Sequence, residues 1–196
     1  MQPPLRDPFL QMLSEQLAES GYPVSAHASA DTESVEWLES LLPGCFNGQD
    51  VGLRWLSLDD LSGAAEEDDD DEPLPSLVLI RIDALLPFPI DSEQWALTLG
   101  ALEMFNDLLP FGALILRPQA QCWAWQHTVA APATAFNGLL ALRVIDTLRF
   151  YLDLLSPALI EAFARRDEPE SLREAIRRKL AAWAEDAGGD SNGAQP

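Results

Sequence analysis

The segment Leu77–Asp83 has the strongest strand pattern in the chain, and it limits the fold more than any other feature. Its sequence, LVLIRID, starts with apolar residues and then alternates Ile80 and Ile82 with Arg81 and Asp83. A period of two is typical of a half-buried strand. Other segments must therefore supply further strands and the helices that pack on them.

Four more segments are expected to be strands. Tyr22–Ala28 is short and only weakly strand-like, whereas Val51–Leu58 has a clearer strand pattern. The segments Ala113–Arg117 and Gln121–Ala130 are separated by Pro118-Gln119-Ala120, which predicts a tight antiparallel hairpin. Pro87-Phe88-Pro89 is expected to break the chain after the strong strand.

Apolar residues recur at helical spacing elsewhere. Asp7-Pro8 predicts a helix start by a capping side chain and an early proline, and Asp91 with Gln94 forms a capping-box pattern. Five helices are expected: residues 8–20, a short helix that starts at Asp31 or Thr32 and ends at Pro43-Gly44, 91–109, 135–155 capped by Thr134, and 170–184.

Three details of these helices can be tested against a structure. The short helix would place Val35, Leu38, Leu41 and Leu42 on one side. Ser156-Pro157 would start a new helical segment or kink the long helix. Ser171 with Glu174 is a second capping-box pattern, which predicts the start of the last helix.

The order of elements predicts an α+β fold, with a mostly antiparallel sheet and helices packed over it. We expect a single domain over residues 1–166, a helical extension over 167–186 and a disordered tail over 187–196. Within the domain, residues 59–75 are expected to form a flexible acidic loop, because residues 59–72 contain nine acids.

The charge balance excludes several classes of function. Twelve basic and 32 acidic side chains give a net charge of −20, so binding of nucleic acid or adsorption to an anionic membrane is not expected. No apolar stretch is long enough to insert into a membrane, and the first residues lack the pattern of a signal peptide. We expect a soluble, cytoplasmic protein, and the use of eleven arginines against Lys179 alone hints at a GC-rich bacterial genome.

Candidate chemical residues are few. His27, Cys45, Cys122 and His127 are the complete set of soft metal ligands, and their spacing matches no common zinc motif. The contiguous acids Asp68–Glu72 lack the spaced ligands and central glycine of a calcium loop. Cys122 and His127 would lie on opposite faces of one strand, which argues against a catalytic dyad. We therefore expect no enzyme activity, no metal and no cofactor.

Trp123 and Trp125 share one face of the predicted strand with His127 and Val129. This face is either core beneath the helices or a protein interface, because tryptophan is enriched in binding hot spots. Both alternatives stay open from the sequence.

The last predicted helix is a second candidate for partner binding. Its apolar face would carry Leu172, Ile176, Leu180 and Trp183, and its polar face Arg173 and Arg177. Residues 165–179 hold half of all the basic side chains, interleaved with acids. This pattern indicates either a solvated helix rich in ion pairs or a surface that meets an acidic partner.

Residues 77–163 resemble the YbjN-like domain, which is related in fold to type III secretion chaperones. The resemblance is carried by the strand LVLIRID, the junction NDLLPFG at Asn106–Gly112, the hairpin ALILRPQAQCWAW and the long helix that follows. It implies a sheet-and-helix domain, frequently dimeric, that binds proteins and has no catalytic residues.

These observations predict a non-enzymatic adaptor or chaperone-like domain that docks a partner polypeptide, along a strand edge or in an apolar groove. A homodimer is compatible with this prediction. Two alternatives remain: a structural subunit of a larger bacterial assembly, and a small-molecule sensor or enzyme with a pocket lined by Trp123 and Trp125.

Overall fold

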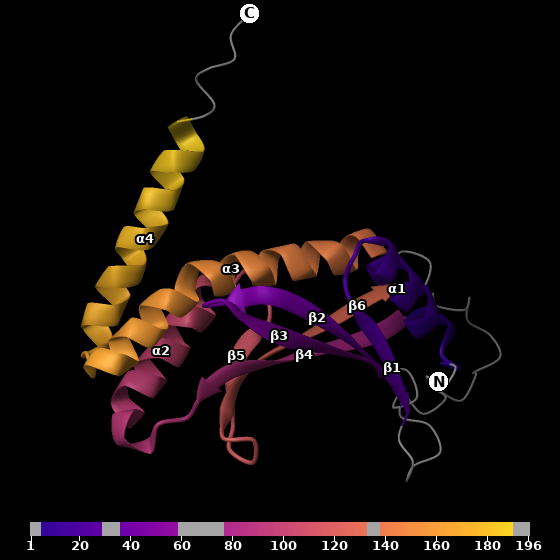
Figure 1. The fold of residues 1–196 in the computed structure, drawn as a ribbon, viewed down its shortest axis with the longest axis horizontal. Helices are drawn as coiled ribbons and strands as arrows, with labels where there is room; N and C mark the ends of the chain where they lie inside the picture. Colours follow the sequence, from indigo (N-terminus) through magenta and orange to yellow (C-terminus); the bar gives the residue numbers. More distant parts are fainter. Residues whose placement is uncertain (1–4, 29–35, 59–76, 133–137, 190–196) are drawn as a thin grey trace, which may run out of the picture.

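Six strands form one antiparallel sheet in the computed structural model, which describes residues 5–28, 36–58, 77–132 and 138–189 (Figure 1). The strand order is β1-β2-β3-β4-β6-β5, and every neighbouring pair is antiparallel. The strands are Val24–Ala28, Glu36–Phe46, Gln49–Ser57, Leu77–Pro89, Ala113–Arg117 and Cys122–Pro132, numbered β1 to β6 along the chain. The predicted α+β class with an antiparallel sheet is confirmed.

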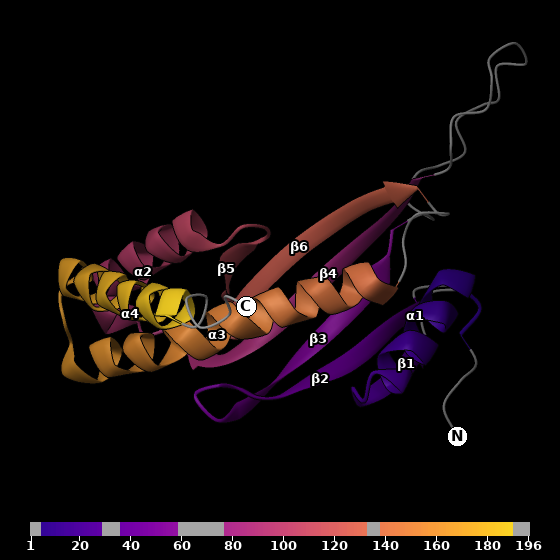
Figure 2. The same ribbon diagram turned by 90° about the horizontal axis from the view of Figure 1, so that it is seen from above.

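Four α-helices pack with this sheet: α1 (Pro8–Glu19), α2 (Trp95–Leu108), α3 (Gly138–Arg165) and α4 (Pro169–Gly189). Helices α1 and α3 lie across one face of the sheet, and α2 lies next to β5 and packs against α4 (Figures 1 and 2). In the described part of the chain, no helix covers the opposite face. Among the residues that the structure describes, the helices therefore bury one side of the sheet, and the other side is called the open face below.

Local sequence signals explain where several helices begin. The Asp7 carboxylate accepts hydrogen bonds from the backbone N–H groups of Phe9 and Leu10, as the capping pattern predicted. Asp91 in the same way accepts from Glu93 N–H at 2.9 Å, at the start of a short 3₁₀ turn that leads into α2. Gln94 Nε2 donates to the Asp91 carboxylate at 2.8 Å.

The expected short helix between Asp31 and Pro43 is wrong where the structure describes it, because β2 occupies Glu36–Phe46. Leu38 and Leu42 are four residues apart, a spacing that fits both helix and strand periods. Side chains along this segment alternate in burial, so Leu38, Ser40 and Leu42 all face the core. Residues 31–35, including the proposed cap and Val35, lie outside the described residues.

Prolines lie within or at the start of three elements whose boundaries differ from those expected from the sequence. Strand β4 continues to Pro89 through the expected break, with Pro87 and Pro89 on the exposed side of the strand. Pairing of β4 with β3 ends at Leu85, so the missing backbone N–H groups of Pro87 and Pro89 break no hydrogen bond to β3. Helix α3 continues through Pro157, which excludes the alternative of a new helix at that position. Helix α4 begins at Pro169, two residues before Ser171.

One hydrophobic cluster joins the sheet, α1, α2, α3 and the first half of α4. Leu172 and Ile176 of α4 belong to it, so the predicted extension over 167–186 shares the core of the domain. Helix α4 also includes residues 187–189, which were assigned to the tail. The acidic loop over 59–75, the Thr134 cap and residues 190–196 lie outside the described residues.

Candidate functional site

Trp123 and Trp125 lie in the core. Both side chains have 0% exposure, and their rings contact Phe88, Phe163 and Phe111 at centroid distances of 5.7, 6.2 and 5.9 Å. The sequence left core and interface as alternatives, and the structure places these two residues beneath the helices. The cavity beside Trp125 measures only about 10 Å³ and is lined by apolar side chains, which is room for about one water molecule.

The candidate residues of α4 divide into buried and exposed groups. Leu172 and Ile176 are each 1% exposed, and Leu180 is half-buried beside a groove of about 140 Å³ between α2 and α4. Trp183 is 49% exposed and packs against Phe150 at a centroid distance of 4.9 Å. Figure 1 shows the second half of α4 standing away from the body of the protein.

Arg173 and Arg177 of α4 are already paired within the chain. Arg173 lies 2.8 Å from Glu170 and 3.9 Å from Glu103 on α2, and Arg177 lies 4.0 Å from Glu170. These pairs are mostly exposed, so each contributes little to stability. Arg173 and Arg177 therefore form part of the ion-paired surface that the sequence offered as one alternative.

The cysteines and histidines do not converge. Cys45 is buried, and burial raises the pKa of its thiol to about 11. His127 packs against Trp125 and Phe111, and burial lowers its pKa. His27 stacks on Trp37 and lies 3.3 Å from Glu39. Across the described ranges, no group of three metal-capable side chains comes together.

A row of charges crosses the open face, and the sequence pattern indicated only its Arg81 and Asp83. The strand register places Glu39 of β2 opposite Arg54 of β3, and Arg54 opposite Asp83 of β4. Arg54 Nη2 donates to Glu39 at 3.0 Å and lies over the Trp37 ring, 5.3 Å from its centroid. Hydrogen bonds from Arg54 and Trp37 lower the Glu39 pKa, outweighing the effect of its partial burial.

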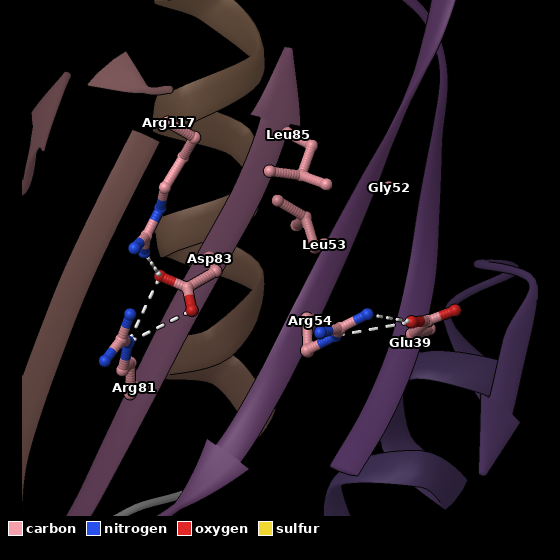
Figure 3. A pocket seen from close by; sticks show the side chains of 8 residues that line it. All are labelled: Glu39, Gly52, Leu53, Arg54, Arg81, Asp83, Leu85 and Arg117. Carbon is pink, nitrogen blue, oxygen red and sulfur yellow. Dashed lines mark hydrogen bonds and ion pairs between the residues drawn. The ribbon is translucent and has the colours of Figure 1, made fainter. Parts of the chain in front are cut away.

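Asp83 receives two arginines, one from its own strand and one from β5 (Figure 3). Arg81 Nε lies 3.2 and 3.0 Å from the two carboxylate oxygens, and Arg117 Nη2 lies 3.5 Å from one of them. These three side chains are 18–35% exposed, so the group is partly withdrawn from solvent. Such charge-assisted contacts hold the side chains in place on the sheet.

A depression of about 380 Å³ lies over these charges. Gly52 and Leu85 form part of its lining and are opposite each other in the register. Because Gly52 has no side chain and nothing would lie within 4 Å of a Cβ there, the surface is hollow at this position. Leu85 is 51% exposed beside it. The site thus combines ionic and apolar contacts, a composition typical of binding surfaces.

The edge strand β5 is capped by a side chain of α2. Asn106 Oδ1 accepts from the Leu114 backbone N–H at 2.6 Å, and Asn106 Nδ2 donates to the Leu114 carbonyl at 3.1 Å. The amide thus makes the two bonds that a further strand would make at this residue. Six residues later, the turn at Gly112 has a φ of 69° and lies directly against the Trp125 ring.

These contacts give a physical reason for the junction Asn106–Gly112, which the sequence singled out only as a resemblance. The open face had one sequence signal, the alternation of Arg81 and Asp83 with Ile80 and Ile82. No helix among the described residues combines the length and apolar character that a membrane span requires. Comparisons with protein-family models, curated proteins and solved structures give no match.

Proposed function

We propose that this protein is a non-enzymatic docking domain that binds a partner polypeptide on the open face of its sheet. The observation that carries the proposal is the depression of about 380 Å³, where ion-paired arginines lie beside the exposed Leu85. Sheets whose second face stays uncovered usually carry a polar surface there. Leu85 lies in this hollow between the ion pairs, where a partner would contact apolar surface and charge together.

At the β5 edge, Asn106 opposes one alternative to docking on the face, which is the addition of a partner strand there. Strand addition requires unpaired backbone groups, and Asn106 occupies those of Leu114. Binding on the face leaves that edge intact and uses side chains, so specificity would come from Leu85 and the arginines around it.

Replacing Leu85 with lysine tests this proposal. The side chain is exposed, so the variant should fold with unchanged stability while a charge enters the contact surface. The matched control is Leu139→Lys on α3, which changes a 61% exposed leucine on the other side of the sheet. Tagged proteins would be used to capture partners from native lysate, and bound polypeptides would be quantified.

The expected result is a stoichiometric polypeptide that binds the wild type and Leu139→Lys but is lost with Leu85→Lys. Hydrogen exchange of the complex should show slower exchange in β3 and β4. Equal capture by all three proteins, with no change of exchange in these strands, would rule out docking on the open face.

A second candidate is a structural subunit that contacts its assembly through the outer half of α4. Trp183 is exposed there, and residues 181–185 are all exposed. Trp183→Lys should then release the protein from a fixed large complex, measured by size-exclusion chromatography of lysate. Ile176 does not suit this test, because it is 1% exposed and its replacement would disturb the core.

A further inference from the structure

The charges around the depression also indicate what kind of polypeptide it accepts, an inference that rests on the proposed docking function. We propose that Arg81 and Arg117 bind a carboxylate side chain from an extended, acidic segment of the partner, with apolar neighbours of that carboxylate packing on Leu85.

The first argument is charge. The depression is lined by three arginines and two acids, so its local charge is positive although the chain carries −20. Glu39 is paired with Arg54, and Asp83 is shared by Arg81 and Arg117. A lysine or arginine from a partner would find both carboxylates occupied, whereas a carboxylate would restore a one-to-one balance.

The second argument is unused hydrogen-bonding capacity. A guanidinium has five N–H donors. Among the described residues, Arg81 donates to Asp83 only through Nε, and Arg117 reaches Asp83 only through Nη2, at 3.5 Å. Their remaining terminal N–H groups belong to side chains that line the depression. Arginine nitrogens in such a setting suit a carboxylate, which accepts from them in pairs.

The third argument is the position of the apolar surface. Leu85 lies two residues after Asp83 on the same face of β4, and Gly52 leaves space opposite it. In an extended ligand, side chains two residues apart also share a face. A carboxylate with a leucine two positions away therefore matches the spacing of charge and apolar surface on β4.

The test uses blocked peptides with the sequences TLTETLT, TLTQTLT and TLTKTLT, which differ only at the central residue. Binding would be followed by NMR through the Nε–Hε signals of Arg81 and Arg117. The glutamate peptide should bind about tenfold or more tightly than the glutamine peptide, the ratio expected for charge-assisted hydrogen bonds. The lysine peptide should bind more weakly still.

Arg81→Gln should abolish the preference for glutamate. The matched control is Arg178→Gln, which removes the same charge from an exposed position on α4. It should keep the preference. If the control loses it equally, the effect is one of net charge, and the inference is wrong.

The remaining outcomes separate this inference from the proposed function. Equal binding of the glutamate and glutamine peptides at the open face would overturn carboxylate recognition and leave docking there intact. No binding of any peptide, to the full chain or to a variant lacking residues 59–72, would count against both. A preference for the glutamate peptide over the glutamine peptide that is seen only after that deletion would also support carboxylate recognition. The nine acids removed would then have masked the preference in the full chain.

Discussion

Replacing Gly112 with alanine should destabilise the fold through two separate effects. Gly112 has a φ of 69°, and a Cβ at this residue would lie 2.6 Å from Cε2 and Nε1 of Trp125. The left-handed backbone costs roughly 1–2 kcal/mol for a residue with a Cβ. Forcing an additional carbon against a packed ring costs about 1–3 kcal/mol. The free energy of unfolding should therefore fall by about 2–5 kcal/mol.

Gly44 is the matched control, because it shares the backbone conformation without the contact. Its φ is 65°, and nothing lies within 4 Å of a Cβ built there. Gly44→Ala should cost only about 1–2 kcal/mol, the backbone contribution alone. The difference between the two variants then reports the contact between the Gly112 turn and Trp125.

Urea unfolding followed by tryptophan fluorescence measures both variants under the same conditions. The slope of the free energy against urea concentration should be unchanged, so that midpoints can be compared directly. Equal destabilisation by Gly112→Ala and Gly44→Ala would refute the packing argument. It would mean that the Trp125 ring moves away from the turn without cost.

Contacts and burial inside the domain lead to four further predictions. Asn106→Ala should lower the free energy of unfolding by about 1–2 kcal/mol, because two hydrogen bonds to the β5 edge are lost at a site that water can reach. Asn106→Asp keeps the bond from the Leu114 N–H, so its free energy of unfolding in the same urea assay should lie between those of the wild type and Asn106→Ala. Ser40→Ala removes the acceptor of the Trp55 Nε1–H bond of 2.9 Å in a buried site and should cost about 1–3 kcal/mol by urea unfolding. Burial raises the pKa of the Cys45 thiol to about 11 from 9.0. Iodoacetamide at pH 8 should therefore alkylate Cys122 and spare Cys45 until the protein unfolds, and peptide mass mapping would show which cysteine has reacted. The unfolded thiol ionises first, so the free energy of unfolding should also decline as pH rises from about 9 to 11, and constant stability across that range would contradict the raised pKa.

Local periodicity predicted most elements of the sheet and of the helices on it. The strand at Leu77–Asp83 was predicted correctly from its alternation of Ile80 and Ile82 with charged residues, and the hairpin after Gly112 from two strand-like segments separated by Pro118-Gln119-Ala120. Strand β2 was missed because Leu38 and Leu42 satisfy both periods, and pairing with β1 and β3 decided between them. That choice depends on contacts distant in the sequence, which a local pattern does not contain.

The candidate site could not be predicted for the same reason, because its residues are far apart in the sequence and meet only in the folded sheet. The sequence placed Trp123 and Trp125 on one face but could not say which face the helices cover. Arg117 and Asp83 meet because β5 lies on β6, which itself lies on β4, an order that follows from the complete topology. The sequence placed Ile176 and Trp183 on the same apolar face of the last helix, and the division into a buried Ile176 and an exposed Trp183 required the position of α2.

The amide of Asn106 has a consequence for how copies of this protein could assemble. A sheet with two open edges can add copies at both ends without limit, and such head-to-tail growth leads to filaments. Here the Asn106 amide occupies the backbone N–H and carbonyl of Leu114 on β5, so continuation from copy to copy is disfavoured at this residue relative to the β1 end. Two copies joined at the β1 end would form a pair related by a two-fold axis, with the Asn106 amide bonded to Leu114 of β5 at each outer margin.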